Sequence, residues 1–212
     1  MELRTKDFAE IFATWHETMK KNREELVKLD QVAGDGDLGI SMDEGFLAMK
    51  NYVEENKTID DLGKLFYNAG KIMNDTASSS LGTLISAGFK EVGKGLKGKT
   101  FITGCELGAF LDSFQIGIIK LGGAKVGEKT FLDGFDPAVK IMLGNMKEED
   151  TKLSLRKAAL AAQEGSAKTV GMLACWGRAA RRGEDSRQIL DPGSVVASLI
   201  VTSLSDYINS QK

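Results

Sequence analysis

Apolar residues recur every three or four positions along most of this chain. Near the N-terminus, for example, Phe8, Phe12 and Trp15 fall on one face of a helix. Similar stripes cover residues 8–19, 42–53, 62–73, 81–92, 107–118, 131–142, 153–173 and 195–208. The strict alternation that is typical of a half-buried strand is not found in the sequence. The pattern therefore predicts an all-α protein with about eight amphipathic helices.

A capping-box pattern predicts where some of these helices begin. In this pattern a hydroxyl and, three residues later, a carboxylate satisfy free backbone N–H groups of the first turn. The segments with this spacing are Ser41–Glu44, Thr103–Glu106 and, in a weaker form, Thr58–Asp61. No stretch resembles an interdomain linker and no internal repeat is found. Residues 1–212 are therefore predicted to form a single domain.

The charges of the chain are nearly balanced. The 28 lysines and arginines face 30 aspartates and glutamates, which gives a formal charge of −2. This balance argues against a general nucleic-acid binder or a polybasic membrane protein. No apolar run approaches the roughly 18 residues that span a membrane, and the N-terminus lacks a signal-peptide pattern. Since two cysteines cannot make a disulfide scaffold, we expect a cytoplasmic protein that binds neither nucleic acid nor membrane.

The chain contains one histidine, His16. This count argues against a zinc cluster built from histidines and against a Ser-His-Asp triad. His16 lies in the first helical stripe, away from the glycine-rich loops that carry the candidate chemistry. We therefore predict that it is a surface residue and not a phosphoryl relay.

Residues 93–100 match the phosphate-binding pattern GxxxxGK[ST]. That loop works only where a buried strand delivers it and a helix follows at once. Here the preceding residues, 89–92, end a helical stripe and carry two charges, and no strand is predicted. We therefore interpret the segment as a basic surface loop. A P-loop ATPase that uses Lys99 and Thr100 remains the alternative.

A second glycine-rich segment, residues 30–39, holds Asp30, Asp35 and Asp37 within eight residues. Converging carboxylates repel one another by about 1 kcal/mol per close pair in water and by more when partly buried. Mg²⁺ relieves this repulsion, because it takes carboxylates, water and substrate phosphates as ligands. The loop also leads into a predicted helix, whose N-terminal amides favour phosphate oxygens. A solvated turn rich in Asp and Gly remains the alternative to this metal site.

Arginines gather near the C-terminus. Four of the seven in the chain lie between Arg178 and Arg187, shortly before the turn Asp191-Pro192-Gly193. Guanidinium groups suit phosphate recognition, although this segment alone favours a solvated turn. Two further loops, residues 76–83 and 122–130, add hydroxyls and amides at predicted helix starts. Together these loops contain the groups that phosphoryl transfer needs.

The ordered set of these motifs resembles the nucleotide-binding L subunit of dihydroxyacetone kinase. The motifs are Asp30 with Asp35-x-Asp37-x-Gly39, Ala77-Ser78-Ser79 with Gly82-Thr83, Gly127-Glu128-Lys129-Thr130, Gly177-Arg178-Ala179, Gly183-Glu184 and Asp191-Pro192-Gly193. The resemblance covers nearly the whole chain. It implies a barrel of eight antiparallel amphipathic helices, with the nucleotide in loops at one rim.

The resemblance also implies a role for each matching residue. Asp30, Asp35 and Asp37 would hold two Mg²⁺ ions on the phosphates of ADP or ATP, and with Arg178 they would form the catalytic set. The remaining binding residues would be Leu38, Gly39 and Ser41 on the phosphate and ribose side, Ser78, Ser79 and Ser80 at the phosphates, Gly122 and Phe131 beside the adenine, and Asp191, Pro192 and Gly193 closing over the nucleotide.

Four positions depart from the pattern of that family. Leu38 stands where a histidine is usual, Trp176 where a lysine is common, Glu128 where an aspartate is usual, and Phe131 where a methionine is usual. The metal triad and Arg178 are intact. We therefore expect nucleotide binding to persist, although the acceptor or the partner can differ.

The resemblance implies a phosphoryl transfer that needs partners. The acceptor would be dihydroxyacetone or a related small ketose on a separate K subunit. The phosphate would come from exchanging ATP, or from bound ADP that a phosphotransferase-system protein rephosphorylates. A homodimer is left open. So are two non-catalytic interpretations: a nucleotide-sensing homologue, in which the change at Leu38 has ended turnover, and a purely structural helical bundle.

Overall fold

The structure is all-α, as the hydrophobic pattern predicts. This computed structural model describes residues 1–145, 147 and 150–211. Its long helices are α1 (Thr5–Gln31), α2 (Leu38–Glu55), α3 (Leu62–Thr76), α4 (Ser80–Gly95), α5 (Leu107–Gly122), α6 (Phe131–Leu143), α7 (Thr151–Ala167) and α8 (Pro192–Ser210). Each predicted stripe falls on one of them. Only α7 is shorter than expected, because Gly171 (φ +96°) and its neighbours leave the helical conformation before Leu173.

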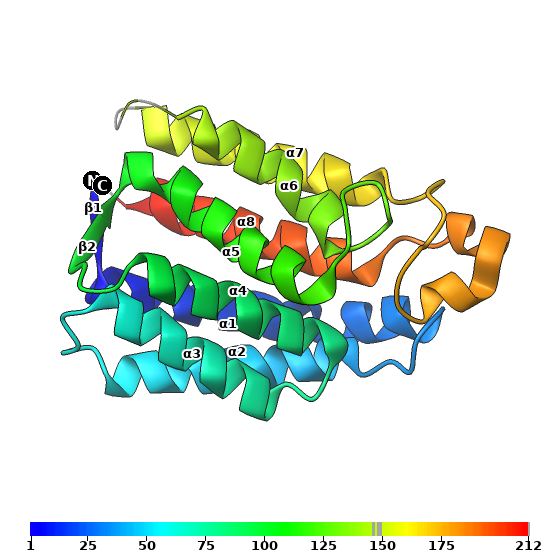
Figure 1. The fold of residues 1–212 in the computed structure, drawn as a ribbon, viewed down its shortest axis with the longest axis horizontal. Coiled ribbons are helices and arrows are strands. Elements are labelled where there is room, and N and C mark those ends of the chain that lie inside the picture. The colour runs from blue at the N-terminus through cyan, green and yellow to red at the C-terminus, as the bar shows by residue number, and fades with distance from the viewer. Residues whose placement is uncertain (146, 148–149, 212) are drawn as a thin grey trace.

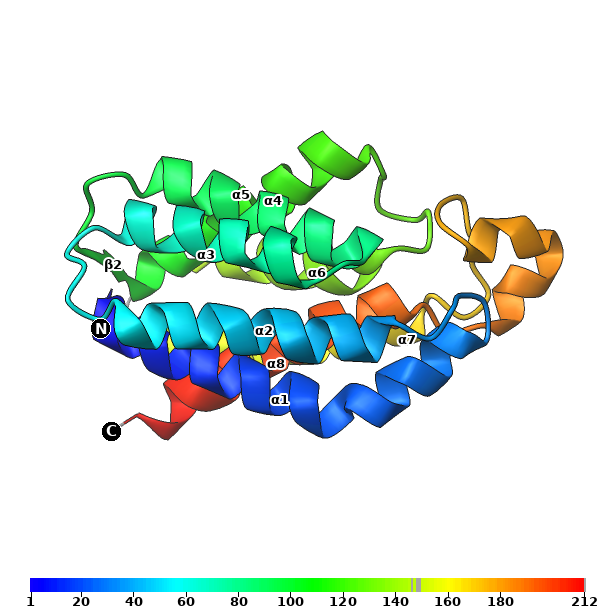
Figure 2. The same cartoon turned by 90° about the horizontal axis from the view of Figure 1, so that it is seen from below.

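The eight helices close into a ring. Each helix packs against the next one along the chain, and α8 packs against α1, with a further contact between α6 and α8. Figures 1 and 2 show the helices running side by side along one common axis. The α1–α2, α5–α6 and α7–α8 connections lie at the end opposite the two chain termini (Figure 1).

Aromatic rings fill the middle of this ring of helices. Successive ring centroids lie 4.8 to 6.0 Å apart along a row of buried side chains made of Phe8, Phe66, Phe89, Phe114, Phe135 and Phe131. Edge-to-face and offset pairs at such distances add to the stabilisation that burial gives. The row ends at Phe131, the first residue of α6, which also borders the cleft described below.

The helical fold also contains two short strands that the hydrophobic pattern does not reveal. Strands β1 (Glu2–Arg4) and β2 (Phe101–Thr103) pair antiparallel, with Leu3 opposite Ile102, and both of these side chains are buried. Each strand has three residues, so alternation along the sequence is too short to be recognised. The pair fastens the N-terminal residues to the connection between α4 and α5, which contains the 3₁₀ turn η1 (Gly104–Glu106).

Only one of the predicted capping boxes forms. Thr103 and Glu106 form it before η1. Helix α2 instead begins at Leu38, so Ser41 lies within its first turn and does not cap it. At α3 the cap is Asp61, whose side chain accepts a hydrogen bond from the amide of Lys64. Asp61 therefore takes the place of the Thr58 hydroxyl as the cap of this helix.

The P-loop alternative does not fit this fold. Residues 93–100 begin inside helix α4 and end in the turn before β2, so no buried strand delivers them. The side chain of Lys99 is ion-paired with Glu106. This segment lies at the end of the ring that holds β1 and β2, away from the cleft described below (Figure 1). It is a surface turn, as the sequence favours.

His16 is buried, which corrects the prediction that it is a surface residue. Helix α2 covers the face of α1 that carries it, and 5% of the residue is exposed. Its Nε2 lies 3.3 Å from Oδ1 of Asp43, whose Oδ2 accepts a hydrogen bond from Arg23 at 3.1 Å. Asp43 of α2 thus partners one ring nitrogen, Nε2, inside the helix pair. Nδ1 has no hydrogen-bond partner among the described residues, and Oε1 of Glu17 lies 3.5 Å from it.

Among the described residues, no single helix combines the length and the apolar character that crossing a membrane requires. A sharply bent pair, residues 179–188 with 192–210, meets that test only when its two parts, 75° apart, are counted together.

Candidate functional site

A cleft of about 1030 Å³ opens at the end of the ring opposite the chain termini. The α1–α2, α3–α4, α5–α6 and α7–α8 connections all contribute to its lining. The last of these contains the 3₁₀ segment η3 (Ala179–Gln188), which projects beyond the helices (Figure 1). Loops that are far apart in the sequence thus meet at one concave site.

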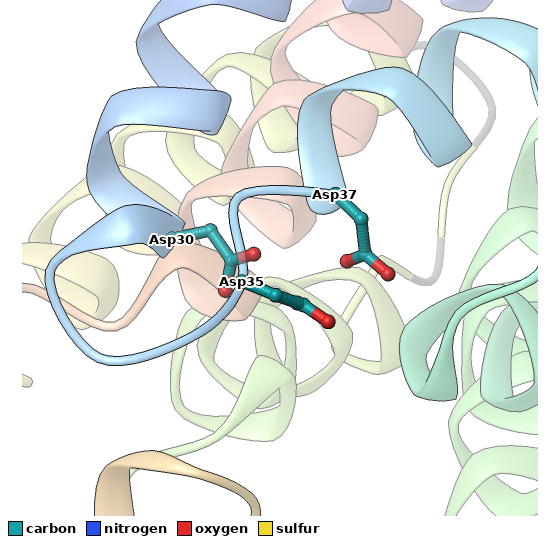
Figure 3. Close-up of side chains that lie close together, drawn as sticks. All are labelled: Asp30, Asp35 and Asp37. Atoms are coloured by element: carbon teal, nitrogen blue, oxygen red, sulfur yellow. The ribbon is translucent and has the colours of Figure 1, made fainter.

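Three carboxylates converge on one side of the cleft. Ligand oxygens of Asp30, Asp35 and Asp37 lie within 4.8 Å of one another (Figure 3). Asp30 lies in the last turn of α1, and Asp35 and Asp37 lie in the loop that leads to α2. The amide of Gly36 donates to Oδ2 of Asp30 at 2.9 Å, which fixes that carboxylate. A Cβ atom on Gly34 would lie 2.3 Å from Oδ1 of Asp30. The loop therefore needs glycine at this position for Asp30 to point as it does.

The cluster is electrostatically strained. The pKa of Asp37 is raised, first by burial and then by the negative charges of Asp35 and Asp30. Arg178 opposes this shift, and its guanidinium is ion-paired with Asp35. One guanidinium cannot neutralise three carboxylates. This set of oxygen donors suits a hard divalent cation such as Mg²⁺.

The serine loop faces the same cleft. Ser79 caps α4, and its Oγ accepts a hydrogen bond from the amide of Gly82 at 3.1 Å. Because a hydroxyl can accept and donate at once, Ser79 can still donate its own hydrogen to a ligand. Ser78 and Ser80 flank it, are exposed and also line the cleft. The loop thus presents hydroxyls at the N-terminus of a helix, where anions are favoured.

The N-terminus of α8 forms another wall. Pro192 is its first residue, and Oδ2 of Asp191 caps it by accepting a hydrogen bond from the amide of Ser194 at 2.7 Å. Burial raises the pKa of Asp191 to about 7, while the Ser194 amide and the Lys129 ammonium oppose this rise. Asp191 therefore exchanges its proton near neutral pH.

Lys129 joins the loops around the cleft. Its ammonium donates to the carbonyls of Thr169, at 2.7 Å, and Ile189, and the residue is 2% exposed. Burial lowers the pKa of Lys129, and the negative charge of Asp191 opposes the shift. The backbone of Lys129 has φ +62°, which few residues other than glycine adopt. The α5–α6 loop is thereby tied to both ends of the α7–α8 connection.

A family model for the DAK2 domain matches residues 32–206 of the chain. The chain belongs to the DAK2 domain family.

Curated relatives confirm the resemblance to the L subunit. The chain is 30% identical to the PEP-dependent dihydroxyacetone kinase 2, ADP-binding subunit DhaL, of Listeria innocua, over 83% of this chain and 82% of that relative. It is 27% identical to the corresponding Escherichia coli subunit, over 86% and 87%. It is also 30% identical to the L-erythrulose 1-kinase of Mycolicibacterium smegmatis, over 93% of this chain and 35% of that protein.

A solved structure confirms the fold. The dihydroxyacetone kinase of C. freundii in its native form superimposes with a TM-score of 0.71 at 24% identity. The match covers 93% of this DAK2 domain protein and 34% of the solved chain. The chain therefore spans about a third of the length of that kinase.

The cleft of this DAK2 domain brings most of the predicted residues together. The members of the predicted set that line it are Asp30, Asp35, Asp37, Leu38, Ser78, Ser79, Ser80, Gly122, Phe131, Arg178, Asp191, Pro192 and Gly193. Their individual roles toward a ligand stay predictions. Three of the acidic lining residues come from the end of α1 and the α1–α2 loop, and Asp191 comes from the α7–α8 connection. Much of the apolar part comes from α4, α5 and α6.

Gly39 and Ser41 are not among the residues that line the cleft, and their role toward a ligand stays a prediction. Gly39 faces α1, where an added Cβ atom would lie 2.1 Å from the carbonyl oxygen of Arg23. Its role is to let the two helices approach closely. Ser41 is buried, and its Oγ lies 2.9 Å from Oγ of Ser79, so it supports the serine loop from behind.

Sequence reasoning missed Lys129 and Trp176 as site residues. Both line the cleft. Lys129 lies between Thr130 and Glu128 in a segment that looks like a plain helix start, because Thr130 and Asp133 form a capping box for α6. The box itself could have been recognised from its spacing. Nothing in the sequence marks the burial of the lysine, which depends on carbonyls 40 and 60 residues away.

Proposed function

We propose that this chain is the nucleotide-binding, phosphoryl-transferring subunit of a dihydroxyacetone kinase, an enzyme that acts on an alcohol group. The observation that carries the proposal is the convergence of Asp30, Asp35 and Asp37 beside Arg178 in one cleft. Relatives that match over most of their own length are named ADP-binding subunits of dihydroxyacetone kinases, which supports ADP or ATP as the ligand.

Different cleft residues would bind the metal and the phosphates. Asp30, Asp35 and Asp37 would hold Mg²⁺, and we propose two ions. Bound Mg²⁺ neutralises phosphate oxygens as charge moves during transfer. Arg178 would turn from Asp35 toward a phosphate, and the hydroxyl of Ser79 would donate to another phosphate oxygen. The chain would thus position the phosphates and neutralise their charge, with no covalent intermediate on the protein.

The resemblance to the L subunit also bears on where the acceptor binds. We propose that a separate K subunit presents dihydroxyacetone, or a related small ketose, at the mouth of the cleft. The names of the curated relatives, which include dihydroxyacetone and erythrulose kinases, support this class of acceptor.

We further propose that ADP stays bound and is rephosphorylated in place by a phosphotransferase-system protein. The PEP-dependent subunits match this chain over 82 to 87% of their own length, which supports this donor over exchanging ATP. ATP that exchanges as readily as ADP would contradict this part of the proposal and would leave the kinase role intact.

Titration calorimetry tests the nucleotide site. The protein is first stripped of nucleotide and then titrated with ADP or ATP, in Mg²⁺ or in EDTA. We expect tight ADP binding that requires Mg²⁺ and is lost in Asp35→Asn. Asp60→Asn, an exposed carboxylate in the α2–α3 connection, should bind like the wild type. Failure of the wild type to bind either nucleotide would overturn the proposal.

Transfer is tested separately. The ADP-loaded chain is mixed with a purified K subunit, dihydroxyacetone and a phosphotransferase-system donor, and the phosphorylated ketose is measured. We expect product only when all components are present. Tight ADP binding without product would favour the nucleotide-sensing alternative, to which the departure at Leu38 points.

A further inference from the structure

The two tryptophans of the chain have opposite surroundings. Trp15 is 1% exposed in the core, and its Nε1 donates to the carbonyl of Ile200 at 3.0 Å. Trp176 is 44% exposed and lines the cleft. An indole is a costly side chain to leave in water, because its burial would stabilise the fold. Because Trp176 is both exposed and part of the cleft lining, its ring is accessible to a ligand in the cleft.

The indole of Trp176 is held in place by the α5–α6 loop. Its Nε1 donates to Oε2 of Glu128 at 2.5 Å, and the backbone amide of Lys125 donates to the same oxygen at 2.8 Å. The amide of Cys175 donates to the carbonyl of Glu128 at 3.2 Å. The far edge of the ring lies 3.6 Å from the position of a Cβ atom on Gly123. The ring is thus fixed against the loop that leads to Phe131.

Residues 176–178 form a short segment whose second end, at Arg178, is fixed at the acidic part of the cleft. Two residues after Trp176, the guanidinium of Arg178 is ion-paired with Asp35. Gly177 between them has φ +65°, a conformation that glycine adopts without strain. Residues 176–178 therefore join the α5–α6 loop to the α1–α2 loop. Arg178 faces the acidic cluster, while Trp176 stands beside the apolar lining.

That apolar lining suits a flat aromatic group. Leu84, Gly122 and Phe131 line the cleft, and Leu84 packs where a side chain on Gly122 would lie. If phosphates bind at the aspartates and Arg178, the base of the nucleotide reaches the apolar part of the same cleft. An indole beside this part offers a π surface, on which any base can stack.

We propose that Trp176 is a base-recognition residue. Its indole completes the wall of the subsite that takes the nucleotide base, and Glu128 is the positioning residue that holds the indole there. This inference rests on the proposed function, namely that the cleft binds ADP or ATP. Because stacking tolerates different bases, Trp176 provides affinity for the base and does not distinguish adenine from guanine.

Comparison of ADP with inorganic pyrophosphate, each with Mg²⁺, separates base recognition from phosphate recognition. We expect Trp176→Ala to weaken ADP binding about ten- to hundredfold and to leave pyrophosphate binding unchanged. Trp176→Phe should keep most of the ADP affinity, because it keeps an aromatic face. Glu128→Ala should weaken ADP binding, whereas Glu128→Gln should bind like the wild type, because its amide oxygen still accepts from the indole.

The outcomes distinguish this inference from the proposed function. An equal loss of ADP and pyrophosphate binding in Trp176→Ala would show that the indole only holds loops together, and would overturn the inference. ADP binding by that variant at wild-type strength would overturn it too, while the proposed function would stand. A wild type that binds neither ligand would overturn the proposed function itself.

Fluorescence quenching provides a readout in the unmodified protein. Acrylamide should quench Trp176 and spare Trp15, which is 1% exposed. We expect ADP with Mg²⁺ to protect the quenchable emission and pyrophosphate with Mg²⁺ to leave it quenchable. In Trp176→Phe the quenchable emission should be absent, which identifies its source. Unchanged quenching of the wild type at saturating ADP would overturn the inference.

Discussion

The guanidinium of Arg178 is paired with the carboxylate of Asp35, although these residues lie on loops from opposite ends of the chain. The pair holds a positive charge beside the three converging aspartates in the ligand-free protein. A phosphate group that binds with Mg²⁺ offers Arg178 a second anionic partner of the same kind. Arg178 is therefore available to move from the protein to the ligand with little change of position.

Removal of this guanidinium should weaken nucleotide binding. Charge-assisted hydrogen bonds contribute about 1.5–3 kcal/mol, so we expect Arg178→Ala to reduce ADP affinity by about ten- to hundredfold. Arg178→Lys should restore only part of the loss, because an ammonium lacks the planar fork. Calorimetry with ADP and Mg²⁺ measures both. Arg156→Ala, an exposed arginine on α7, is the control and should bind normally. Unchanged affinity in Arg178→Ala would remove the residue from the site.

The carboxylate of Asp37 should destabilise the ligand-free protein. Its pKa is raised by burial and by its acidic neighbours, so the ionised form is unfavourable in the ligand-free protein. We expect Asp37→Asn to stabilise that protein by about 1 kcal/mol at neutral pH, a rise of about 2–4 °C in melting temperature. The same variant should lose Mg²⁺-dependent ADP binding. Thermal unfolding without ligand, compared with Asp60→Asn, checks the first part, and a lower melting temperature would contradict it.

The protonation of Asp191 should give a measurable pH dependence of stability. Its folded pKa of about 7 exceeds the ordinary aspartate value of 3.8, so between these values the folded state binds a proton that the unfolded state has released. Stability from this group therefore falls as pH rises from about 4 to about 7.

Asp191→Asn isolates this effect, because asparagine is an equally good helix cap and does not titrate. We expect the melting temperature of the variant, minus that of the wild type, to grow as pH rises toward 7 and then to level off. Thermal unfolding measured from about pH 4.5 to about pH 8 gives both curves. If melting temperature depends on pH in the same way in the wild type and the variant, the pKa of Asp191 is not raised by folding.

Lys129 should be needed for the shape of the cleft. Lys129→Met keeps most of the length of the side chain but leaves the carbonyls of Thr169 and Ile189 without their buried donor. We expect a loss of about 2–3 kcal/mol in the free energy of unfolding and a weaker affinity for ADP. Denaturant unfolding and calorimetry measure the two effects. Lys125→Met, an exposed lysine in the same loop, should change neither, and a stable Lys129→Met would contradict the tethering role.

The helices could be predicted from sequence because each buries one face, and the spacing of Phe8, Phe12 and Trp15 records that burial directly. Strands β1 and β2 could not, because three residues are too few to show alternation. The burial of His16 depends on Asp43 of the next helix, a contact that periodicity does not reveal.

The acidic part of the site could be predicted because its residues are close in sequence. Asp30 ends α1, and Asp35 and Asp37 follow within seven residues in the loop to α2, so their spacing brings them together. Lys129 and Trp176 act through partners 40 to 60 residues away, which no local motif encodes. The glycine-rich segment around Gly39 suggests contact with a ligand, although the close approach of two helices explains this glycine. The single-domain organisation of residues 1–212 stays a prediction.

The contact between α1 and α8 that closes the ring also sets the order in which the cleft can be completed. As the chain is synthesised, Asp30, Asp35 and Asp37 emerge early, whereas Asp191 and Pro192 emerge near the end. The cleft stays open on one side until α8 has docked. A ligand that touches both walls would join α1 to α8, so that separation of these two helices would release it.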